Sequence, residues 1–202
     1  SLVFSNDDIE GIWDFSWPGR GIGHPPSSLV DFTNEGKSSF ESFLPELDPT
    51  LKCVMPGIPL GIVDPYPIEI VMQDHQILFL YEHFHMVRRI FMDERIVPDN
   101  WPVSLIGYSI GHWENKTLVV KTTHMSPDNY VWTNGMPFSG HKDSYVIERY
   151  TREDNILHFD AEIHDPVNYK TPYKVSGQRI FSPDMNIYEY ECLPDFAGSG
   201  VI

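Results

Sequence analysis

Gln76–Asp93, with the sequence QILFLYEHFHMVRRIFMD, is the stretch that decides the fold. Apolar residues alternate along it with Glu82, His83, His85 and a pair of arginines. A β-strand has this pattern when one face packs on a core and the other meets water or a cavity. The stretch therefore predicts a β-rich fold. Because several of its polar groups can take part in chemistry, it also predicts a site built partly on it.

The alternation sorts these polar groups onto two faces of an extended chain. One face carries a tyrosine and two histidines, and the other carries a glutamate and an arginine between apolar residues. The two sets are Tyr81, His83 and His85, and Glu82, Phe84, Met86 and Arg88. Neutral His can act as a general base, while Tyr or Arg can stabilise an oxyanion. A bend near His85 would bring both faces to one site; alternatively, these groups line a solvated face or are satisfied by cross-strand hydrogen bonds.

Strand-like segments separated by turn residues recur along the chain and favour hairpins. The expected strands cover residues 9–15, 67–73, 76–84 with a continuation or a bend into 85–92, 104–113, 117–124, 143–152, 156–164, 173–182 and 186–192. Eight or nine antiparallel strands joined by hairpins are typical of an up-and-down barrel without a free edge. We predict an all-β fold, a single antiparallel up-and-down barrel in one domain over residues 1–202, able to enclose one small ligand.

Residues 1–66 are expected to hold the first strand and then a proline-rich, largely irregular excursion. A short strand is expected at residues 28–32 and a short helix at residues 37–43. A segment as long as 38–66 without strong periodicity is either a lid or a packed excursion. The barrel meander then occupies residues 67–192.

Charge and hydropathy exclude two classes of partner. The formal net charge is −15 over 202 residues, and no cluster of Lys and Arg exceeds a pair. Phosphate binding needs a basic patch, so we expect no nucleic-acid partner and no binding to an anionic membrane surface. No apolar run approaches the roughly 18 residues that span a bilayer. The sequence does not indicate which oligomeric state the protein has.

Two cysteines, Cys53 and Cys192, leave two alternatives open. In an oxidising compartment they can pair and tie the early chain to its last predicted strand, which would contribute about 4–5 kcal/mol. In a reducing compartment they are two buried hydrophobic residues.

The loop over residues 125–142 and the histidines beside it form a second candidate region. His124, Asp128, Tyr130, Trp132 and His141 fall within eighteen residues. The aromatic residues suit a lid over an apolar ligand, with His and Asp supplying polar contacts. An ordinary packed loop is the alternative.

His83-x-His85 also has the spacing of two metal ligands on one strand face. A third ligand would come from His124, His141 or Glu148, and zinc or iron(II) would suit such a set. We keep a metal-dependent enzyme as an alternative and expect no cofactor in the leading hypothesis, because no nucleotide, phosphate or thiolate motif is present.

Two short motifs are given structural interpretations. Residues 107–111, GYSIG, fit the G-x-S-x-G pattern of hydrolases, but that elbow needs a strand, a turn and a helix, whereas this run continues as strand. Gly11-Ile12-Trp13 resembles the Gly-x-Trp signature of lipocalin-like (calycin) barrels. That resemblance implies that Trp13 closes one barrel end and that a late-strand arginine, Arg149 or Arg179, packs on its face.

A longer series of motifs runs from Cys53 to Pro166. It comprises Cys53 followed by PGIP at 56–59, PYP at 65–67, LYE at 80–82 leading to Arg88, DER at 93–95, GYSIGHWENKTLVV at 107–120, then Trp132, Glu148-Arg149 and Asp165-Pro166. In this order they resemble an uncharacterised family of exported bacterial proteins. The family usually has Gly-His-Pro-His after the Trp, where this chain has GMPF at 135–138 and His141 three residues later.

The resemblance implies export, to a periplasmic or secreted location, and favours a Cys53–Cys192 disulfide. It brings no known reaction. It gives weight to Tyr81, Glu82 and Arg88 within the opening stretch, and it leaves open whether His141 replaces the family's histidine pair.

The leading functional hypothesis is a cofactor-free lyase, hydratase or isomerase that acts by acid–base chemistry on a hydrophobic small molecule. The expected catalytic residues are Tyr81, Glu82, His85, Arg88, His124 and His141, and the expected ligand-binding residues are Tyr108, Asp128, Tyr130, Trp132 and Phe138. The main alternative is a non-catalytic, lipocalin-like carrier in which the same residues only orient an apolar ligand.

Overall fold

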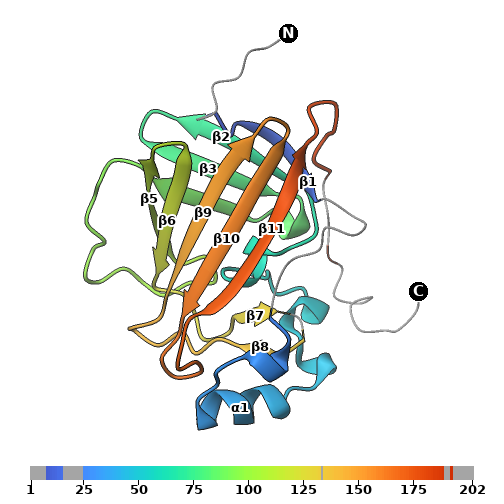
Figure 1. The fold of residues 1–202 in the computed structure, drawn as a ribbon, viewed down its shortest axis with the longest axis vertical. Coiled ribbons are helices and arrows are strands. Elements are labelled where there is room, and N and C mark those ends of the chain that lie inside the picture. Colours follow the sequence, from blue (N-terminus) through green and yellow to red (C-terminus); the bar gives the residue numbers. More distant parts are fainter. Residues whose placement is uncertain (1–7, 16–24, 133, 189–191, 193–202) are drawn as a thin grey trace.

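The structure is a computed structural model that describes residues 8–15, 25–132, 134–188 and 192. Within these residues, nine strands form a closed barrel (Figure 1). They are β1 (Gly11–Phe15), β2 (Ile68–Gln73), β3 (Gln76–Tyr81), β4 (Val87–Phe91), β5 (Tyr108–Glu114), β6 (Thr117–Thr123), β9 (Tyr145–Glu153), β10 (Ile156–His164) and β11 (Tyr173–Phe181). The all-β class and the closed barrel are as predicted.

The order around the barrel is β1-β11-β10-β9-β6-β5-β4-β3-β2, so β1 closes it between β2 and β11. All neighbouring strands are antiparallel except β4 and β5, which pair in parallel through Ile90 with Ser109 and Phe91 with Ile110. The expectation of a purely antiparallel meander is wrong at this one place. Residues 92–107 return along the outside of the barrel before β5 begins, so no hairpin joins these two strands (Figure 1).

The two ends of the barrel are closed differently. At the end where β9 meets β10, Trp13 is fully buried, and the Arg152 guanidinium lies 5.1 Å from the centre of its ring. Arg152 is therefore the arginine on the tryptophan, and the expectation of Arg149 or Arg179 is wrong. The register explains this, because Arg152 shares the inner face of β9 with Tyr150, whereas Arg149 faces outward opposite Asp160.

The other end, which we call the capped end, is where β3 finishes at Tyr81 and β11 starts at Tyr173. It is covered by the N-terminal excursion and by the hairpin of β7 (Tyr130–Trp132) and β8 (Met136–Pro137) (Figure 1). The helix α1 (Asn34–Glu41) contacts β8. The expected loop at 125–142 thus contains this hairpin and is packed against the core.

The N-terminal excursion lies at the capped end, where its last part is buried. It contains α1 and the short 3-10 helices η1 (Ser27–Leu29), η2 (Pro45–Leu47), η3 (Pro49–Lys52) and η4 (Leu60–Ile62). Residues 56–64 are all buried, and we call them the plug. The helix expected at 37–43 forms a few residues earlier, capped by the Thr33 hydroxyl, which accepts from Gly36 N. The strand expected at 28–32 is wrong: it is replaced by η1 and one bridge between Phe32 and Tyr169.

The C-terminal part also departs from the sequence expectation. Residues 186–188 of the last predicted strand are not in a strand, and residues 189–191 lie outside the described part of the chain. Cys53 and Cys192 form a disulfide with Cα atoms 5.5 Å apart. This resolves the alternative that the two cysteines had left open.

Among the described helices, none has the length and apolarity that crossing a membrane requires.

Candidate functional site

A buried ion pair occupies the centre of the barrel. The Arg88 guanidinium donates two hydrogen bonds to the Glu148 carboxylate, Nη2 to Oε1 at 2.6 Å and Nη1 to Oε2 at 2.8 Å. It also donates to the hydroxyls of Thr122 at 2.6 Å and Ser109 at 3.1 Å. The exposed fractions of the Arg88 and Glu148 side chains are 1% and 0%. Every charge here is compensated inside the protein, as buried charges must be.

Two buried tyrosines complete this network. The Tyr150 hydroxyl donates to Glu148 Oε2 at 2.7 Å, and burial raises the pKa of Tyr150 well above its usual value. Burial also raises the pKa of Tyr81, partly opposed by the nearby charge of Arg88. For Arg88 burial acts to lower the pKa, but the attraction and hydrogen bonds of Glu148 outweigh it and raise the pKa. At neutral pH both tyrosines are therefore neutral and Arg88 is a cation.

The turn between β3 and β4 brings Tyr81 and Arg88 to the same side. The chain leaves its extended conformation after Tyr81 and passes through η5 (His83–His85). Phe84 and His85 take positive φ angles of 59° and 49° there. Arg88 then lies directly opposite Phe79 on the inner face. The bend near His85 that the sequence analysis considered is thus present. It turns Tyr81 and Arg88 inward, while His85 stays exposed.

A second polar group lies where the plug meets this turn. His83 Nδ1 lies 2.6 Å from Asp64 Oδ2, with exposed fractions of 13% and 4% for the two side chains. The His83 ring stacks on Tyr66, with the two ring centres 4.3 Å apart. A carboxylate at this distance from one imidazole nitrogen fixes the tautomer and orientation of the ring. His83 and Asp64 therefore form an oriented dyad at the capped end.

Arg179 holds this dyad from inside the barrel. Its guanidinium donates to the backbone oxygens of Asp64 and Tyr66, both at 2.7 Å. The side chain is 1% exposed, and burial lowers the pKa of Arg179, while the nearby carboxylate charge of Asp64 acts in the opposite direction. Among the described residues no carboxylate lies within ion-pair distance of Arg179. Its charge is thus less compensated than that of Arg88.

The two groups form one polar region. Arg179 is one of the charges that lower the pKa of Tyr81, so the dyad, Tyr81 and the central ion pair are electrostatically connected. We call this set the buried polar region; it comprises Asp64, Tyr81, His83, Arg88, Glu148, Tyr150 and Arg179. Such a set can orient a bound molecule through Arg and Tyr donors and can exchange a proton through the imidazole.

The other expected catalytic residues lie outside this region. Glu82 is half-buried and accepts a hydrogen bond from Tyr188 N at 3.0 Å. His85 is exposed, and so is His141, whose Nδ1 accepts from Asp143 N at 3.2 Å. His124 lies at the end of β6 with a positive φ of 58°, and its Nδ1 pairs with the Thr123 hydroxyl at 2.9 Å. The structure therefore does not bring these four side chains together with Tyr81 and Arg88.

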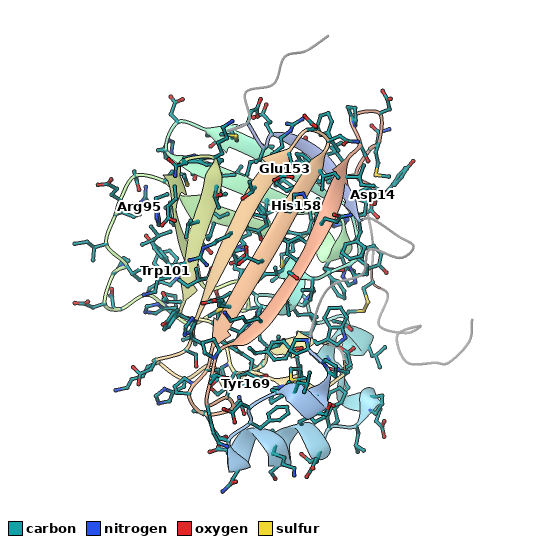
Figure 2. The ribbon with its side chains drawn as sticks, in the orientation of Figure 1. Asp14, Arg95, Trp101, Glu153, His158 and Tyr169 are labelled. Carbon is teal, nitrogen blue, oxygen red and sulfur yellow. A yellow bond between two sulfur atoms is a disulfide. The ribbon has the colours of Figure 1, made fainter. Side chains whose placement is uncertain are left out.

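The expected ligand-binding residues are dispersed as well. Tyr108 faces outward, between Phe91 and Trp101, with ring centres at 5.0 and 4.6 Å. Figure 2 shows Trp101 with Arg95 on the β5 side of the barrel, away from the capped end. Asp128 is exposed and accepts from the Ser126 hydroxyl at 2.9 Å. The remaining three belong to the packing of the β7–β8 hairpin: Tyr130 meets Phe43 edge-on, Trp132 packs on the core, and Phe138 is a core residue.

The expected metal pair is not on one strand face. His83 and His85 fall in η5, where the chain is not extended, so the spacing argument made from a strand is wrong. Within the described residues, no group of three or more His, Cys, Asp or Glu side chains is arranged to hold a metal ion. Residues 107–111 run into strand β5, as the sequence analysis expected. Ser109 accepts a hydrogen bond from Arg88 inside the barrel, a contact that the sequence did not predict.

Sequence reasoning did not assign four members of the buried polar region to this site: Asp64, Glu148, Tyr150 and Arg179. Glu148 lies in the apolar register of its strand, between Val146 and Tyr150, and a carboxylate in that register is a detectable signal of a buried ion pair. Asp64 and Arg179 meet across more than a hundred residues, and nothing in the local sequence indicates their contact.

Comparisons with known proteins give no match, either among family models or among curated proteins. The similarity to exported proteins therefore rests on the motifs alone.

Proposed function

We propose that the protein is a cofactor-free enzyme, a lyase or isomerase, that moves a proton on a hydrophobic small molecule at the capped end of the barrel. The 2.6 Å contact between His83 and Asp64 is the observation that carries this proposal. A buried carboxylate that orients an imidazole is the arrangement by which proteins make histidine a general base or acid. The proposed base is therefore His83, in place of His85.

The neighbouring groups support the same chemistry. Abstraction of a proton next to a carbonyl places negative charge on the carbonyl oxygen, which hydrogen-bond donors and cations stabilise. Arg179 supplies a buried cation with no carboxylate partner among the described residues, and Tyr81 supplies a neutral hydroxyl, because burial raises the pKa of its phenol. In this proposal Arg88 and Glu148 are positioning residues, because their hydrogen bonds are taken up within the barrel.

Deuterium exchange tests the proposal without knowledge of the natural substrate. Hydrophobic ketones and β-hydroxy ketones would be incubated with the protein in D2O, and deuterium at the carbon next to the carbonyl would be followed by NMR. We expect catalysed exchange that falls about 100-fold or more in His83→Gln, the usual size of a lost general base. Asp64→Asn should lower it as well, whereas His85→Gln, on the same turn but exposed, should leave it unchanged. Full exchange in His83→Gln would overturn the assignment of the base.

A carrier for an apolar ligand is the second candidate. The saturated hydrogen bonding of Arg88 and Glu148 favours it, since no group in the central network is left to react. The barrel and the Gly11-Ile12-Trp13 signature, with Arg152 on the Trp13 ring, agree with a lipocalin-like carrier. Binding of a ketone without deuterium exchange or any chemical change on prolonged incubation would favour the carrier.

We also propose a periplasmic or secreted location. The Cys53–Cys192 disulfide supports it, because disulfides persist in oxidising compartments. Thiol labelling of the protein in its native cell, followed by mass spectrometry, would test this: two unlabelled cysteines agree with the proposal, and two labelled ones contradict it.

A further inference from the structure

The barrel has its shortest strand pairing between β4 and β5. These two strands are the parallel pair, and their register holds only Ile90 with Ser109 and Phe91 with Ile110. Among the described residues, every other neighbouring pair of barrel strands shares three or more residue pairs. Parallel pairing is also slightly less stable per residue than antiparallel pairing. We call this junction the seam, and it is the part of the barrel wall that costs least to open.

The inner side of the seam leads to the buried polar region. Arg88 Nε donates across the seam to the Ser109 hydroxyl at 3.1 Å, the longest of the four hydrogen bonds that Arg88 makes. The other three go to Glu148 and Thr122, which lie on β9 and β6. Loss of the Ser109 contact therefore leaves Arg88 with its counter-charge. The turn that carries His83 directly precedes β4, so the dyad lies at the start of the same strand.

Residues 93–103, which we call the strap, lie on the outside of the seam and contact both of its strands (Figure 1). The Arg95 guanidinium lies 3.9 Å from the centre of the Phe91 ring on β4. The Trp101 ring meets Tyr108 on β5 edge-on, with ring centres 4.6 Å apart. Figure 2 labels both strap residues on this side of the barrel. Because the ring centres of Phe91 and Tyr108 are themselves 5.0 Å apart, these four side chains close the seam from outside.

The rest of the strap is held weakly. Within the described chain its backbone makes one hydrogen bond, from Trp101 N to the Pro98 oxygen at 3.0 Å. Ile96 and Val103 are 89% and 60% exposed. Segments with few backbone hydrogen bonds and few buried apolar contacts open locally at a small cost in free energy. The strap can therefore detach while the other strands stay paired.

We propose that the seam is the entrance to the buried polar region and that the strap is its lid. When the contacts of Arg95 and Trp101 break, the two residue pairs of the seam separate and a small apolar molecule can pass between β4 and β5. The identity of that molecule rests on the proposed function. The opening itself can be measured without any ligand.

The hydrogen-bond pattern of β4 provides the measurement. Met92 N donates to the His75 oxygen at 2.9 Å, on the side of β3. Successive N–H groups of an extended strand point to opposite sides, so Arg88 and Ile90 also direct theirs to β3, whereas Phe91 directs its own to β5. Opening of the seam therefore exposes the Phe91 amide to solvent and leaves the Arg88 and Ile90 amides protected.

Native-state hydrogen exchange followed by NMR tests this in the intact, oxidised chain. We expect the Phe91 amide to exchange at least about tenfold faster than the Arg88 and Ile90 amides of the same strand. Trp101→Ala should speed exchange at Phe91 about fivefold further, the effect of one lost aromatic pair. Ile96→Ala is the matched control, since it shortens an exposed side chain of the same strap, and it should change no rate.

A cross-link closes the seam directly. Phe91→Cys with Ile110→Cys places a disulfide across the seam, and Ile110→Cys with Lys121→Cys places one across the register pair of β5 and β6 as the control. The reference for each is the same protein with its two new thiols alkylated before oxidation. The seam cross-link should slow exchange of the amide at position 91 about tenfold, and the control cross-link should leave it unchanged. Mass spectrometry verifies each bond; if the seam bond does not form, Trp101→Ala decides the question.

The outcomes separate the entrance from the proposed function. Equal exchange rates at Phe91 and Ile90 in wild type, or an unchanged rate at position 91 after cross-linking, overturn the entrance. If wild type catalyses deuterium exchange of ketones, the seam cross-link should lower that rate about tenfold, and a full rate in the cross-linked protein also overturns the entrance. Fast exchange at Phe91 without any ketone exchange supports the opening and contradicts the proposed function alone.

Discussion

Glu148 is the residue on which the centre of the barrel depends. It occupies a position of β9 whose inner neighbours, Val146 and Tyr150, are aliphatic and aromatic. Removing a carboxylate and a guanidinium from water carries a desolvation penalty of several kcal/mol per ion, which their attraction only roughly repays. The pair with Arg88 therefore adds little net stability, yet neither charge can be removed alone.

We predict that Glu148→Gln lowers the free energy of unfolding by about 3–5 kcal/mol, because it leaves the Arg88 cation buried without a counter-charge. Urea denaturation measures this. The control is Glu162→Gln, the same change in a carboxylate that accepts from Lys174 at 2.7 Å on the outside of the barrel. That substitution should lower the free energy of unfolding by less than about 1 kcal/mol. Equal decreases in the free energy of unfolding of the two variants would show that an uncompensated Arg88 inside the barrel costs no more than a broken ion pair on its surface.

At this scale the sequence predicted only part of the site. Tyr81 and Arg88 could be named because they are polar residues in a strongly β-like stretch. The inward direction of both required a bend whose left-handed residues, Phe84 and His85, have no local signature, since neither is glycine or asparagine. For the same reason the sequence favoured His85 where the structure orients His83.

Strands and the plug differ sharply in how far sequence could predict them. Strands β9 and β10 alternate buried and less buried residues and are joined by a short turn at residues 154–155, so their pairing followed from the sequence. The pairing of β11 with β10 across residues 165–172 did not follow, because the expected hairpin joined residues 173–182 to 186–192. The plug has no such periodicity. It is specified by contacts with distant residues, for example Ile58 N donating to the Leu105 oxygen at 2.8 Å.

Gly57 lets the plug approach the rest of the capped end. Its φ is +66°, and an added Cβ would lie 2.4 Å from the Leu105 oxygen and 2.5 Å from Asn129 Oδ1. We predict that Gly57→Ala lowers the free energy of unfolding by about 2–4 kcal/mol, from backbone strain and steric overlap together. Chemical denaturation monitored by tryptophan fluorescence would measure it.

Gly61→Ala is the matched control within the same plug. Its Cβ would meet chiefly the terminal methyl of Met86, at 2.6 Å, and a flexible side chain can move away. We expect a smaller loss than for Gly57→Ala. A plug that tolerates both substitutions equally would not be packed as tightly as described.

At the scale of the whole molecule, the main cross-link is the Cys53–Cys192 disulfide, which the two cysteines alone did not decide. Cys53 follows η3 just before the plug, and Cys192 lies beyond β11, so the bond encloses eight of the nine barrel strands. Its sequence separation is 139 residues, and the loss of unfolded-chain entropy grows with the length of the loop. The bond therefore stabilises the barrel mainly by restricting the unfolded chain.

Replacement of both cysteines, Cys53→Ser with Cys192→Ser, should lower the free energy of unfolding by about 4–5 kcal/mol. The dependence of that free energy on urea should also steepen, because the unfolded chain without the cross-link exposes more surface. Wild-type protein unfolded in the presence of a reducing agent is the matched comparison, and its curve should shift towards that of the double variant. A double variant with the midpoint of the oxidised wild type would mean that the barrel alone, closed by β1 between β2 and β11, provides the stability assigned here to the cross-link.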